Sequence, residues 1–346
     1  MQRPPAKGGA VKASTKAVSS PKGARAGSAA KSRPSSAASS TAKKGAQGAI
    51  GAYTKLRAVG KGSFGQIWLV RHTQKGGEPI VLKEVHIKKL SANEVKAAKL
   101  EIEVLKKMSH ANIIAFVGTF EVDGITGLLM EHAAAGDLGT AIAKRIKDGR
   151  VRFPESEVRT LILQLASALG HLHDVAKIIH RDVKPANVFM SAGGDVKLGD
   201  FGLCAHLDAQ LSSEPVGTPV YMAPELLAGK PYDKGADVWA FGCTVWEAMS
   251  LASPWSELED GYGGLEGGMA GLLKCVQTRT LDTDSLKVEK GGNYPTALCD
   301  ATAKLLARAP EKRLPLHKLV ELLHEKPAIP ASWGLSAEAA AALAIS

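Results

Sequence analysis

The sequence has few cysteines and no long apolar run. Its cysteines, Cys204, Cys243, Cys275 and Cys299, are spaced 39, 32 and 24 residues apart. No CxxC or Cys/His pair at metal spacing occurs, so we predict neither a disulfide scaffold nor a zinc site. A reducing compartment is therefore expected. No apolar run approaches about 18 residues, which argues against a membrane span.

Acidic residues are absent from the first 50 positions, which hold ten Lys and Arg. The remainder has 34 basic and 34 acidic residues, because the whole chain has 44 and 34. The formal net charge of +10 therefore belongs to the N-terminal seventh of the chain. This distribution argues against a globally basic nucleic-acid-binding domain, whose charge would lie on a folded surface.

Residues 1–49 also lack aromatic residues, Leu and Ile. Such a segment buries too little apolar area to offset its ordering entropy, so we predict a disordered basic arm. It is either a solvated linker or an electrostatic tether for an acidic partner, such as a microtubule tail or nucleic acid. A transit peptide is disfavoured, because Pro4, Pro5, Gly8 and Gly9 interrupt an early helix.

The segment from Tyr53 to Val85 predicts strands around a Gly-rich turn, Gly60-Lys61-Gly62-Ser63-Phe64-Gly65. A dinucleotide-binding turn leads from a strand into a helix, whereas this one joins two strands. Glycines let the backbone approach phosphates closely. Lys83 stands at the end of an apolar strand, where it either reaches phosphate oxygens or is simply solvated.

Residues 92–108 predict a helix in which Glu101, Leu105 and Met108 share one face. A carboxylate on an apolar face needs a partner, and Lys83 is the natural candidate. Glu103 falls on the opposite face with Lys99, Lys106 and Lys107, and we expect it to form a solvated ion pair. Farther along, the apolar run Gly127–Met130 leads into a connector where an adenine could meet backbone groups.

Four short motifs follow one another in the second half of the chain. They are His180-Arg181-Asp182-Val183-Lys184-Pro185-Ala186-Asn187, Asp200-Phe201-Gly202, Gly217-Thr218-Pro219 and Ala223-Pro224-Glu225. Each tripeptide alone is a chance-level match, but their order behind the Gly-rich turn and Lys83 is specific. On these motifs, residues 53–326 resemble a eukaryotic protein kinase.

The resemblance implies an α+β, two-lobed kinase fold. The small N-lobe, about residues 53–130, would be β-rich with one regulatory helix, and the C-lobe, about 136–326, mainly helical. Residues 327–346 would form a short tail. No coiled coil of several heptads follows the domain, and we expect a monomer.

The resemblance also implies the roles of the motif residues, with ATP and Mg²⁺ as cofactors. Asp182 should orient or accept the proton of the attacking hydroxyl, with Lys184 near the γ-phosphate. Asn187 and Asp200 should hold Mg²⁺ through hard oxygen ligands.

Lys83, paired with Glu101, should bind the α- and β-phosphates. The expected ATP-binding residues are Val59, Gly60, Lys61, Gly62, Ser63, Phe64, Gly65, Gln66, Ile67, Val81, Lys83, Met130, Glu131, Ala133 and Phe189.

Five further residues match supporting positions. Asp237 resembles the buried aspartate that organises the catalytic loop, and Arg313 resembles the arginine that pairs with Glu225. Leu105, His180 and Phe201 would form an internal apolar column.

Within the kinases, the segments Lys83-Glu84-Val85, Met130-Glu131-His132 and Val216–Glu225 look most like NIMA-related serine/threonine kinases. Lys184 and Thr218 agree with the serine/threonine type, and Leu203 resembles kinases that prefer serine. Protein Ser or Thr hydroxyls are therefore the expected acceptors. The alternatives are another small Ser/Thr kinase family and a pseudokinase scaffold. The expected location is the cytoplasm, with the nucleus or cytoskeleton as alternatives.

Two departures from the family pattern concern regulation. Glu214 falls where several relatives carry a phosphorylated residue, so we hypothesise that it supplies a permanent negative charge toward Arg181. Ser212 or Ser213 is the alternative switch, and Thr218 is grouped with this regulatory set. Glycines crowd residues 256–294, where relatives carry a short helix, and this predicts a mobile insert.

Overall fold

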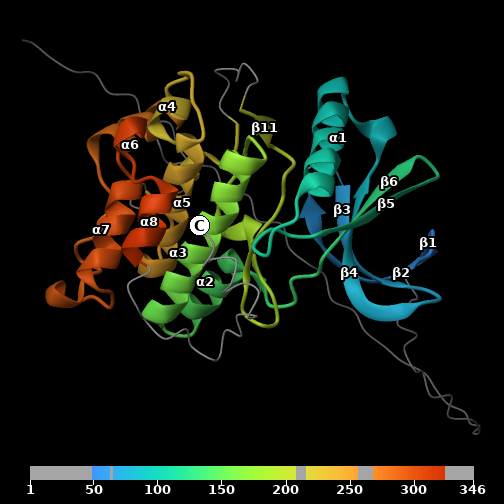
Figure 1. The fold of residues 1–346 in the computed structure, drawn as a ribbon, viewed down its shortest axis with the longest axis horizontal. Coiled ribbons are helices and arrows are strands. Elements are labelled where there is room, and N and C mark those ends of the chain that lie inside the picture. Colours follow the sequence, from blue (N-terminus) through green and yellow to red (C-terminus); the bar gives the residue numbers. More distant parts are fainter. Residues whose placement is uncertain (1–48, 63–64, 208–215, 256–267, 324–346) are drawn as a thin grey trace, which may run out of the picture. The chain divides into compact units, whose positions relative to one another are not determined.

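The computed structural model of the protein describes residues 49–62, 65–207, 216–255 and 268–323. A six-stranded antiparallel sheet forms the N-lobe, in the order β1-β2-β3-β4-β6-β5 (Figure 1). Its strands are β1 Ala49–Ile50, β2 Tyr53–Gly62, β3 Gly65–His72, β4 Gly76–Val85, β5 Phe116–Val122 and β6 Ile125–Met130.

This sheet starts slightly earlier than Tyr53, where the sequence predicted order to begin. Ile50, in β1, is buried and packs with Val70, Leu82 and Leu129. It is the first bulky aliphatic residue after the low-complexity segment, so it can contribute to a core that the preceding residues cannot. In β5, exposed and partly buried residues alternate, as expected of a strand with one covered face.

Helix α1, Ala92–Lys107, follows a short 3₁₀ turn, η1 Ile87–Lys89, and confirms the predicted helix. Its start is fixed by a capping box: the Ser91 hydroxyl accepts from the Glu94 N–H, and the Glu94 carboxylate accepts from the Ser91 N–H. The buried face carries Ala98, Glu101, Val104 and Leu105. Glu103 is exposed, as predicted, but the predicted ion pair is wrong, because Glu103 makes none within the described residues.

Helices build the C-lobe. They are α2 Leu138–Lys147, α3 Glu155–Gly170 with its π-helical extension η2 His171–Val175, α4 Pro224–Leu227, α5 Gly235–Ser250, α6 Gly268–Thr278, α7 Thr296–Leu305 and α8 Leu316–Leu323. Helices α3 and α5 supply much of the core, where Leu165, Leu169 and Phe241 are fully buried. The two-lobed α+β fold is thus confirmed (Figure 1).

Short strands and turns line the catalytic side of the C-lobe. β10 Val196–Leu198, β9 Val188–Met190 and β7 Gly136–Asp137 form one small sheet, and β11 Ala205–His206 pairs with β8 Ile178–Ile179. The 3₁₀ turns are η3 Pro185–Asn187, η4 Pro219–Tyr221, η6 Val288–Lys290 and η7 Pro310–Lys312. The loops between these pieces carry the catalytic motifs.

The glycine-crowded stretch is only partly described, because residues 256–267 lie outside the described ranges. The prediction of a mobile insert is wrong for the part that follows. Gly268–Thr278 forms helix α6, in which Leu272, Cys275 and Val276 are buried. Apolar packing against α4 offsets the low helix propensity of its glycines. None of the helices that the structure describes is long and apolar enough to cross a membrane.

Candidate active site

Three charged side chains meet between the lobes. The Lys83 Nζ lies 2.6 and 2.9 Å from the two carboxylate oxygens of Glu101 on α1, and 3.3 Å from Asp200 Oδ1 of the C-lobe. Lys83 and Glu101 are each about 2% exposed. The predicted pair is therefore formed, and the structure adds Asp200 as a contact across the cleft.

The electrostatics of this cluster keep the lysine charged. Burial acts to lower the pKa of Lys83, but the Glu101 and Asp200 carboxylates outweigh it and hold that pKa raised. Burial acts to raise the pKa of Asp200, but the Lys83 ammonium keeps it below its ordinary value. Burial raises the pKa of Glu101, against the effect of Lys83. Lys83 thus presents a full positive charge in the cleft.

The Gly-rich turn lies directly over Lys83. A Cβ added to Gly62 would lie 3.0 Å from Lys83 Cε and 3.3 Å from Ile67 Cδ1. A Cβ at Gly65 would lie 1.7 Å from the carbonyl oxygen of Glu84, which no side chain tolerates. Gly62 therefore lets β2 approach the lysine closely, and Gly65 lets β3 approach the Glu84 carbonyl of β4. Gly60 has open space around it and carries no such restriction.

The remaining predicted ATP-binding residues of β2, β3 and β4 differ in their contacts and exposure. Gln66 Nε2 donates to the Gly60 carbonyl at 2.6 Å, and Lys61 pairs with Gln66 in the register of β2 and β3. Val59 is 45% exposed on β2, whereas Val81 on β4 is partly buried beside Met130 of β6. Ser63 and Phe64 lie outside the described residues.

The connector between the lobes begins at Met130, and Glu131 follows it. The Glu131 side chain accepts from the Ala115 N–H at 3.1 Å and lies 3.0 Å from Lys197 Nζ. Lys197 also donates to the Ala111 carbonyl at 2.9 Å. Because its carboxylate is engaged in this way and its backbone N–H donates to the Ala115 carbonyl at 2.9 Å, Glu131 can offer only its backbone carbonyl to a nucleotide.

Ala133 offers a binding group that the rest of the protein leaves open. It is buried, and its backbone N–H donates no hydrogen bond within the described residues, although its carbonyl accepts from Gly136. A buried, unpaired N–H needs an acceptor from a ligand or from water. This group fits the edge of a purine, and it supports Ala133 as an ATP contact.

The catalytic loop holds Asp182 in a dense network of hydrogen bonds. Its carboxylate accepts from Thr218 Oγ1 at 2.8 Å, Lys184 Nζ at 2.7 Å and Asn187 Nδ2 at 3.0 Å. Lys184 also donates to Thr218 Oγ1 at 2.7 Å. Thr218, grouped with the regulatory residues on sequence grounds, therefore belongs spatially to the catalytic set.

Asn187 and Asp200 present suitable oxygen donors for a divalent cation. Asn187 Nδ2 donates to both the backbone carbonyl and the carboxylate of Asp182, so the amide oxygen remains available. No group of three or more His, Cys, Asp or Glu side chains suited to a metal occurs among the described residues. Two hard oxygen ligands fit Mg²⁺, which usually completes its shell with water and phosphate oxygens.

Phe189 lies below this site, in β9. A Cβ on Gly199 would come 2.9 Å from Phe189 Cε2, so the glycine before Asp200 makes room for the ring. The ring is partly buried. The placement suits a side chain that forms one wall of a nucleotide site.

Asp237 of α5 organises the loop from below, as the resemblance implied. It is fully buried and accepts from the backbone N–H groups of His180 and Arg181, each at 2.8 Å. It also lies 2.8 Å from His173 Nε2. Burial acts to raise the pKa of Asp237, but these hydrogen bonds outweigh it and keep the pKa lowered.

Arg181 and Asp200 hold left-handed backbone conformations, with φ of 67° and 60°. Such conformations are uncommon for residues with a side chain and are concentrated at functional sites. The Asp237 contacts support the first of them. The predicted column is also present in part: His180 and Phe201 are fully buried, with their ring centroids 5.1 Å apart, and Leu105 is buried.

The regulatory prediction falls mostly outside the described part of the chain. Ser212, Ser213 and Glu214 belong to residues 208–215. The Arg181 guanidinium donates to the carbonyls of Leu203 and Cys204 and to the Tyr232 hydroxyl. The pairing of Glu214 with Arg181 stays a prediction.

Sequence reasoning missed three contacts around the site. His173 supports Asp237, Lys197 holds Glu131, and the Tyr221 hydroxyl donates to Glu247 Oε2 at 2.6 Å. Burial raises the pKa of Glu247 to about 7. Tyr221 lies in the Val216–Glu225 segment and Glu131 in Met130-Glu131-His132, but neither motif predicts these contacts. The ion pair of Arg313 with Glu225, which was predicted, is bidentate, at 2.6 and 2.7 Å.

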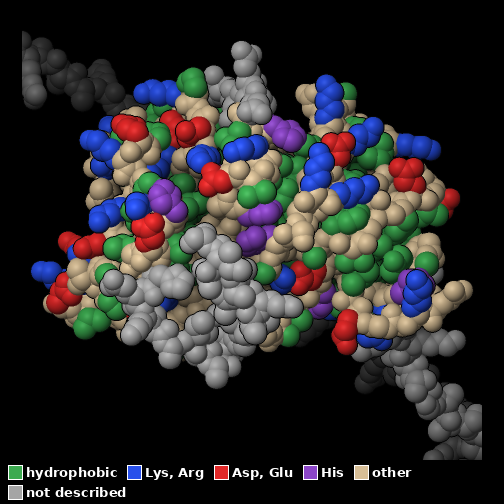
Figure 2. Space-filling model, viewed as in Figure 1, with side chains coloured by type: hydrophobic (Ala, Val, Ile, Leu, Met, Phe, Trp, Pro, Cys, Tyr) green, Lys and Arg blue, Asp and Glu red, His purple; other side chains and the backbone are tan. Residues whose placement is uncertain are grey.

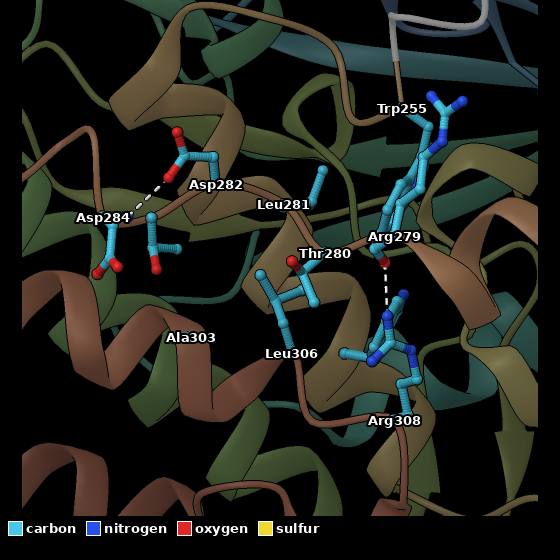
Figure 3. Close-up of a pocket in the computed structure, with 11 residues that line it drawn as sticks. Trp255, Arg279, Thr280, Leu281, Asp282, Asp284, Ala303, Leu306 and Arg308 are labelled. Carbon is cyan, nitrogen blue, oxygen red and sulfur yellow. Dashed lines mark hydrogen bonds between the residues drawn. The ribbon is translucent and has the colours of Figure 1, made fainter.

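A cavity of about 280 Å³ lies elsewhere in the C-lobe, beside the buried Trp239 and Trp255 (Figure 3). Figure 3 shows Arg308 donating to the Arg279 carbonyl, at 2.7 Å, along one side of it. No catalytic motif residue lines this cavity. It does not belong to the candidate active site.

Comparison with known proteins agrees with this geometry. A family model described as the protein kinase domain matches residues 53–324. The chain is 37% identical over 202 residues to serine/threonine-protein kinase Nek1 of Mus musculus, covering 58% of this chain and 16% of that protein.

Two further relatives give the same result. Identity is 37% over 206 residues with Nek5 of Homo sapiens, covering 58% of this chain and 28% of the relative. Identity is 32% over 269 residues with Nek4 of Mus musculus, covering 76% of this chain and 31% of the relative. The aligned part thus spans less than a third of each of these three relatives.

Proposed function

Because the chain belongs to the protein kinase family, we propose that it transfers the γ-phosphoryl group of Mg-ATP to serine or threonine hydroxyls of proteins. The single observation that carries this proposal is the assembled site. Lys83 contacts Glu101 and Asp200 between the lobes, and Asp182 contacts Lys184, Asn187 and Thr218 beside them. A pseudokinase would not need all of these groups.

Phosphoryl transfer depends on positioning and charge neutralisation more than on covalent catalysis. Mg-ATP, when bound, supplies the phosphoryl group and part of the charge that neutralises it. Asn187 and Asp200 would hold the cation, and the Lys83 ammonium would neutralise phosphate oxygens. The Ala133 N–H and the glycines of β2 and β3 would receive the base and the phosphates.

The acceptor side of the site belongs to Asp182 and its neighbours. Asp182 would accept or orient the proton of the incoming hydroxyl. Lys184, 2.7 Å from this carboxylate, would place a positive charge where the transferred group passes. Thr218 would tie the segment that receives the peptide to the catalytic aspartate, at 2.8 Å.

The relatives favour a NIMA-related serine/threonine kinase, since the three reported above are all named Nek kinases. Leu203 favours serine over threonine as the acceptor. We further propose that the basic residues 1–49 tether the kinase to an acidic partner, such as a microtubule tail or nucleic acid, and that the protein acts as a monomer in the cytoplasm, nucleus or cytoskeleton. Removal of residues 1–49 should then weaken binding and reduce its salt dependence.

The decisive experiment is phosphorylation of a degenerate Ser/Thr peptide array by the wild type and by Asp182→Asn. Loss of the carboxylate should reduce the rate by about 10²–10⁴-fold. Asp284→Asn, an exposed aspartate of the C-lobe, is the matched control and should leave the rate unchanged. Equal signals from wild type and Asp182→Asn would overturn the assignment.

A further inference from the structure

A second cavity, of about 350 Å³, opens between the N-lobe helix and the C-lobe. Helix α1 contributes Leu100, Lys107 and Met108, η2 contributes Val175, β8 contributes Ile178 and β11 contributes His206. In Figure 1, α1 and β11 lie next to each other. The cavity therefore joins α1 to the strand that follows the Asp200 motif.

The floor of this cavity is apolar and includes an exposed valine. Leu100, Met108 and Ile178 line it, and Val175 is 69% exposed, the largest exposure recorded for a bulky apolar residue of the described chain. Burying such a side chain against a ligand is favourable by about 25 cal/mol per Å² of apolar surface. The cavity has room for a large apolar side chain, and such anchors dominate peptide binding.

Lys107 lines this cavity, and three more lysines lie on the same helix face or next to a lining residue. Lys96, Lys99 and Lys107 lie on the same side of α1 by helical spacing, and Lys177 precedes Ile178. All four are exposed, and none makes an ion pair within the described residues. Lysine and arginine side chains also gather over α1 in Figure 2.

The remaining titratable groups oppose this charge weakly. Among the described residues, Glu103 is the only acid that lines the cavity, and nearby Asp174 is paired with Lys234 at 2.7 Å. Burial lowers the pKa of His171, and the pKa of His110 behind it lies at about 4. These two imidazoles are therefore neutral near pH 7, and His206 is the third imidazole at the site. The net charge around the cavity is positive.

We propose that this cavity is a docking site for a linear peptide that carries a large apolar anchor flanked by acidic residues. The anchor would fill the apolar floor, and the acidic flanks would pair with the lysines along α1 and beside β8. The first 50 residues of this chain do not fit, because they contain no acidic or aromatic residue. Charge complementarity thus selects an acidic partner.

Docking here has a consequence for catalysis, which rests on the proposed kinase function. The docked peptide would contact α1 and β11 together. Glu101, on the adjacent face of α1, pairs with Lys83, and β11 begins five residues after Asp200. A ligand that holds both elements in this arrangement binds the active conformation more tightly and so favours it. Occupancy should raise kcat.

The test uses the full chain and a fluorescein-labelled synthetic acidic peptide with a central Phe-Leu pair, measured by fluorescence anisotropy. Val175→Glu and Lys107→Glu should each weaken binding about tenfold or more. Val288→Glu and Lys147→Glu are matched controls, because Val288 is also exposed and Lys147 is likewise the last residue of a helix. The controls should bind like the wild type.

Two control peptides separate the anchor from the charge. Replacing Phe-Leu by Ser-Gly, or the acidic residues by lysine, should each abolish binding. Equal binding of either control peptide, unchanged binding by the cavity variants, or no measurable binding of the acidic peptide overturns the proposal.

Sedimentation velocity tests the other occupant, a second copy of the chain. Self-association that Val175→Glu and Lys107→Glu abolish would assign the cavity to that copy instead. The binding assay does not use ATP turnover, so its failure is distinguishable from failure of the proposed kinase activity.

Discussion

Each lobe anchors a buried ion pair between distant parts of the chain, and the two pairs are built differently. In the C-lobe, Arg313 holds Glu225 through two guanidinium nitrogens, at 2.6 and 2.7 Å. Its nitrogens also donate to the carbonyls of Ala307 and Gly235, each at 2.9 Å, and of Arg308, at 3.2 Å. In the N-lobe, the Lys83 ammonium lies between two carboxylates of different elements, Glu101 and Asp200.

The difference separates a permanent connection from an adjustable one. The planar guanidinium of Arg313 is surrounded by protein acceptors, so its hydrogen bonds are satisfied without any ligand. Lys83 is a compact charge on a flexible stem, and one of its partners, the Asp200 side chain, is 31% exposed. The N-lobe charge can therefore exchange a carboxylate for a ligand anion, whereas the C-lobe charge cannot.

The largest effect should come from Lys83→Met, which removes the adjustable charge. Loss of one group that stabilises transferred charge lowers kcat by about 10²–10³-fold. Steady-state kinetics with a serine peptide should show this loss in kcat more than in KM for the peptide. Lys75→Met, which removes an exposed lysine of the turn between β3 and β4, is the control and should leave kcat unchanged. A variant with wild-type kcat would show that Lys83 has no catalytic role.

Arg313→Met should act on stability instead. It leaves the Glu225 carboxylate buried without its cation, and breaking a buried pair costs about 3–5 kcal/mol. Chemical denaturation should show a correspondingly lower unfolding free energy. Arg308→Met tests whether any arginine of this region gives the same result, because Arg308 is exposed and bonds only to carbonyls. Equal stability of Arg313→Met and the wild type would refute the idea of a permanent connection.

Glu247 sharpens the comparison, because it is a largely buried carboxylate with no cation within the described residues. Its folded pKa of about 7 exceeds the ordinary value of 4.5. The folded state therefore keeps a proton that the unfolded state releases, and this contribution to stability is lost as pH rises from about 4.5 to 7. Above pH 7 the charged carboxylate destabilises the protein by on the order of 2–3 kcal/mol.

Glu247→Gln should remove this pH dependence. The variant should be more stable than the wild type at pH 8, with a smaller difference at pH 5, in thermal denaturation at both values. Glu121→Gln, an exposed glutamate of β5, should track the wild type at both. Parallel pH profiles for Glu247→Gln and the wild type would contradict the raised pKa.

The smallest effect should come from Lys197→Met. Lys197 ties the connector at Glu131 to the Ala111 carbonyl, at 3.0 and 2.9 Å. This part-exposed contact is worth about 1 kcal/mol, so the dissociation constant of an ATP analogue should rise a few-fold while the Lys83 pair remains. Isothermal titration with an ATP analogue measures the shift. Lys230→Met, an exposed lysine of the C-lobe, should leave nucleotide affinity unchanged.

The sequence was sufficient to single out the residues that are proposed to do the chemistry. Asp182, Asn187 and Asp200 could be assigned because phosphoryl transfer restricts both residue type and spacing along the chain. The Lys83–Glu101 pair could be predicted because an acid on an apolar helix face needs a partner. The two-lobed fold followed from the same motifs, while the α6 helix at Gly268–Thr278 was missed because its glycines mask an amphipathic pattern.

Only the tertiary structure determined which residues support the proposed catalytic residues through long-range contacts. His173 meets Asp237 across 64 positions of sequence, Tyr221 meets Glu247, and Lys197 meets Glu131. The cavity between α1 and β11 likewise exists only because two distant segments pack side by side. The catalytic reaction restricts the type and spacing of its residues, so the sequence alone can identify them. Contacts between distant segments depend instead on how helices and strands pack, and no local sequence pattern specifies that packing.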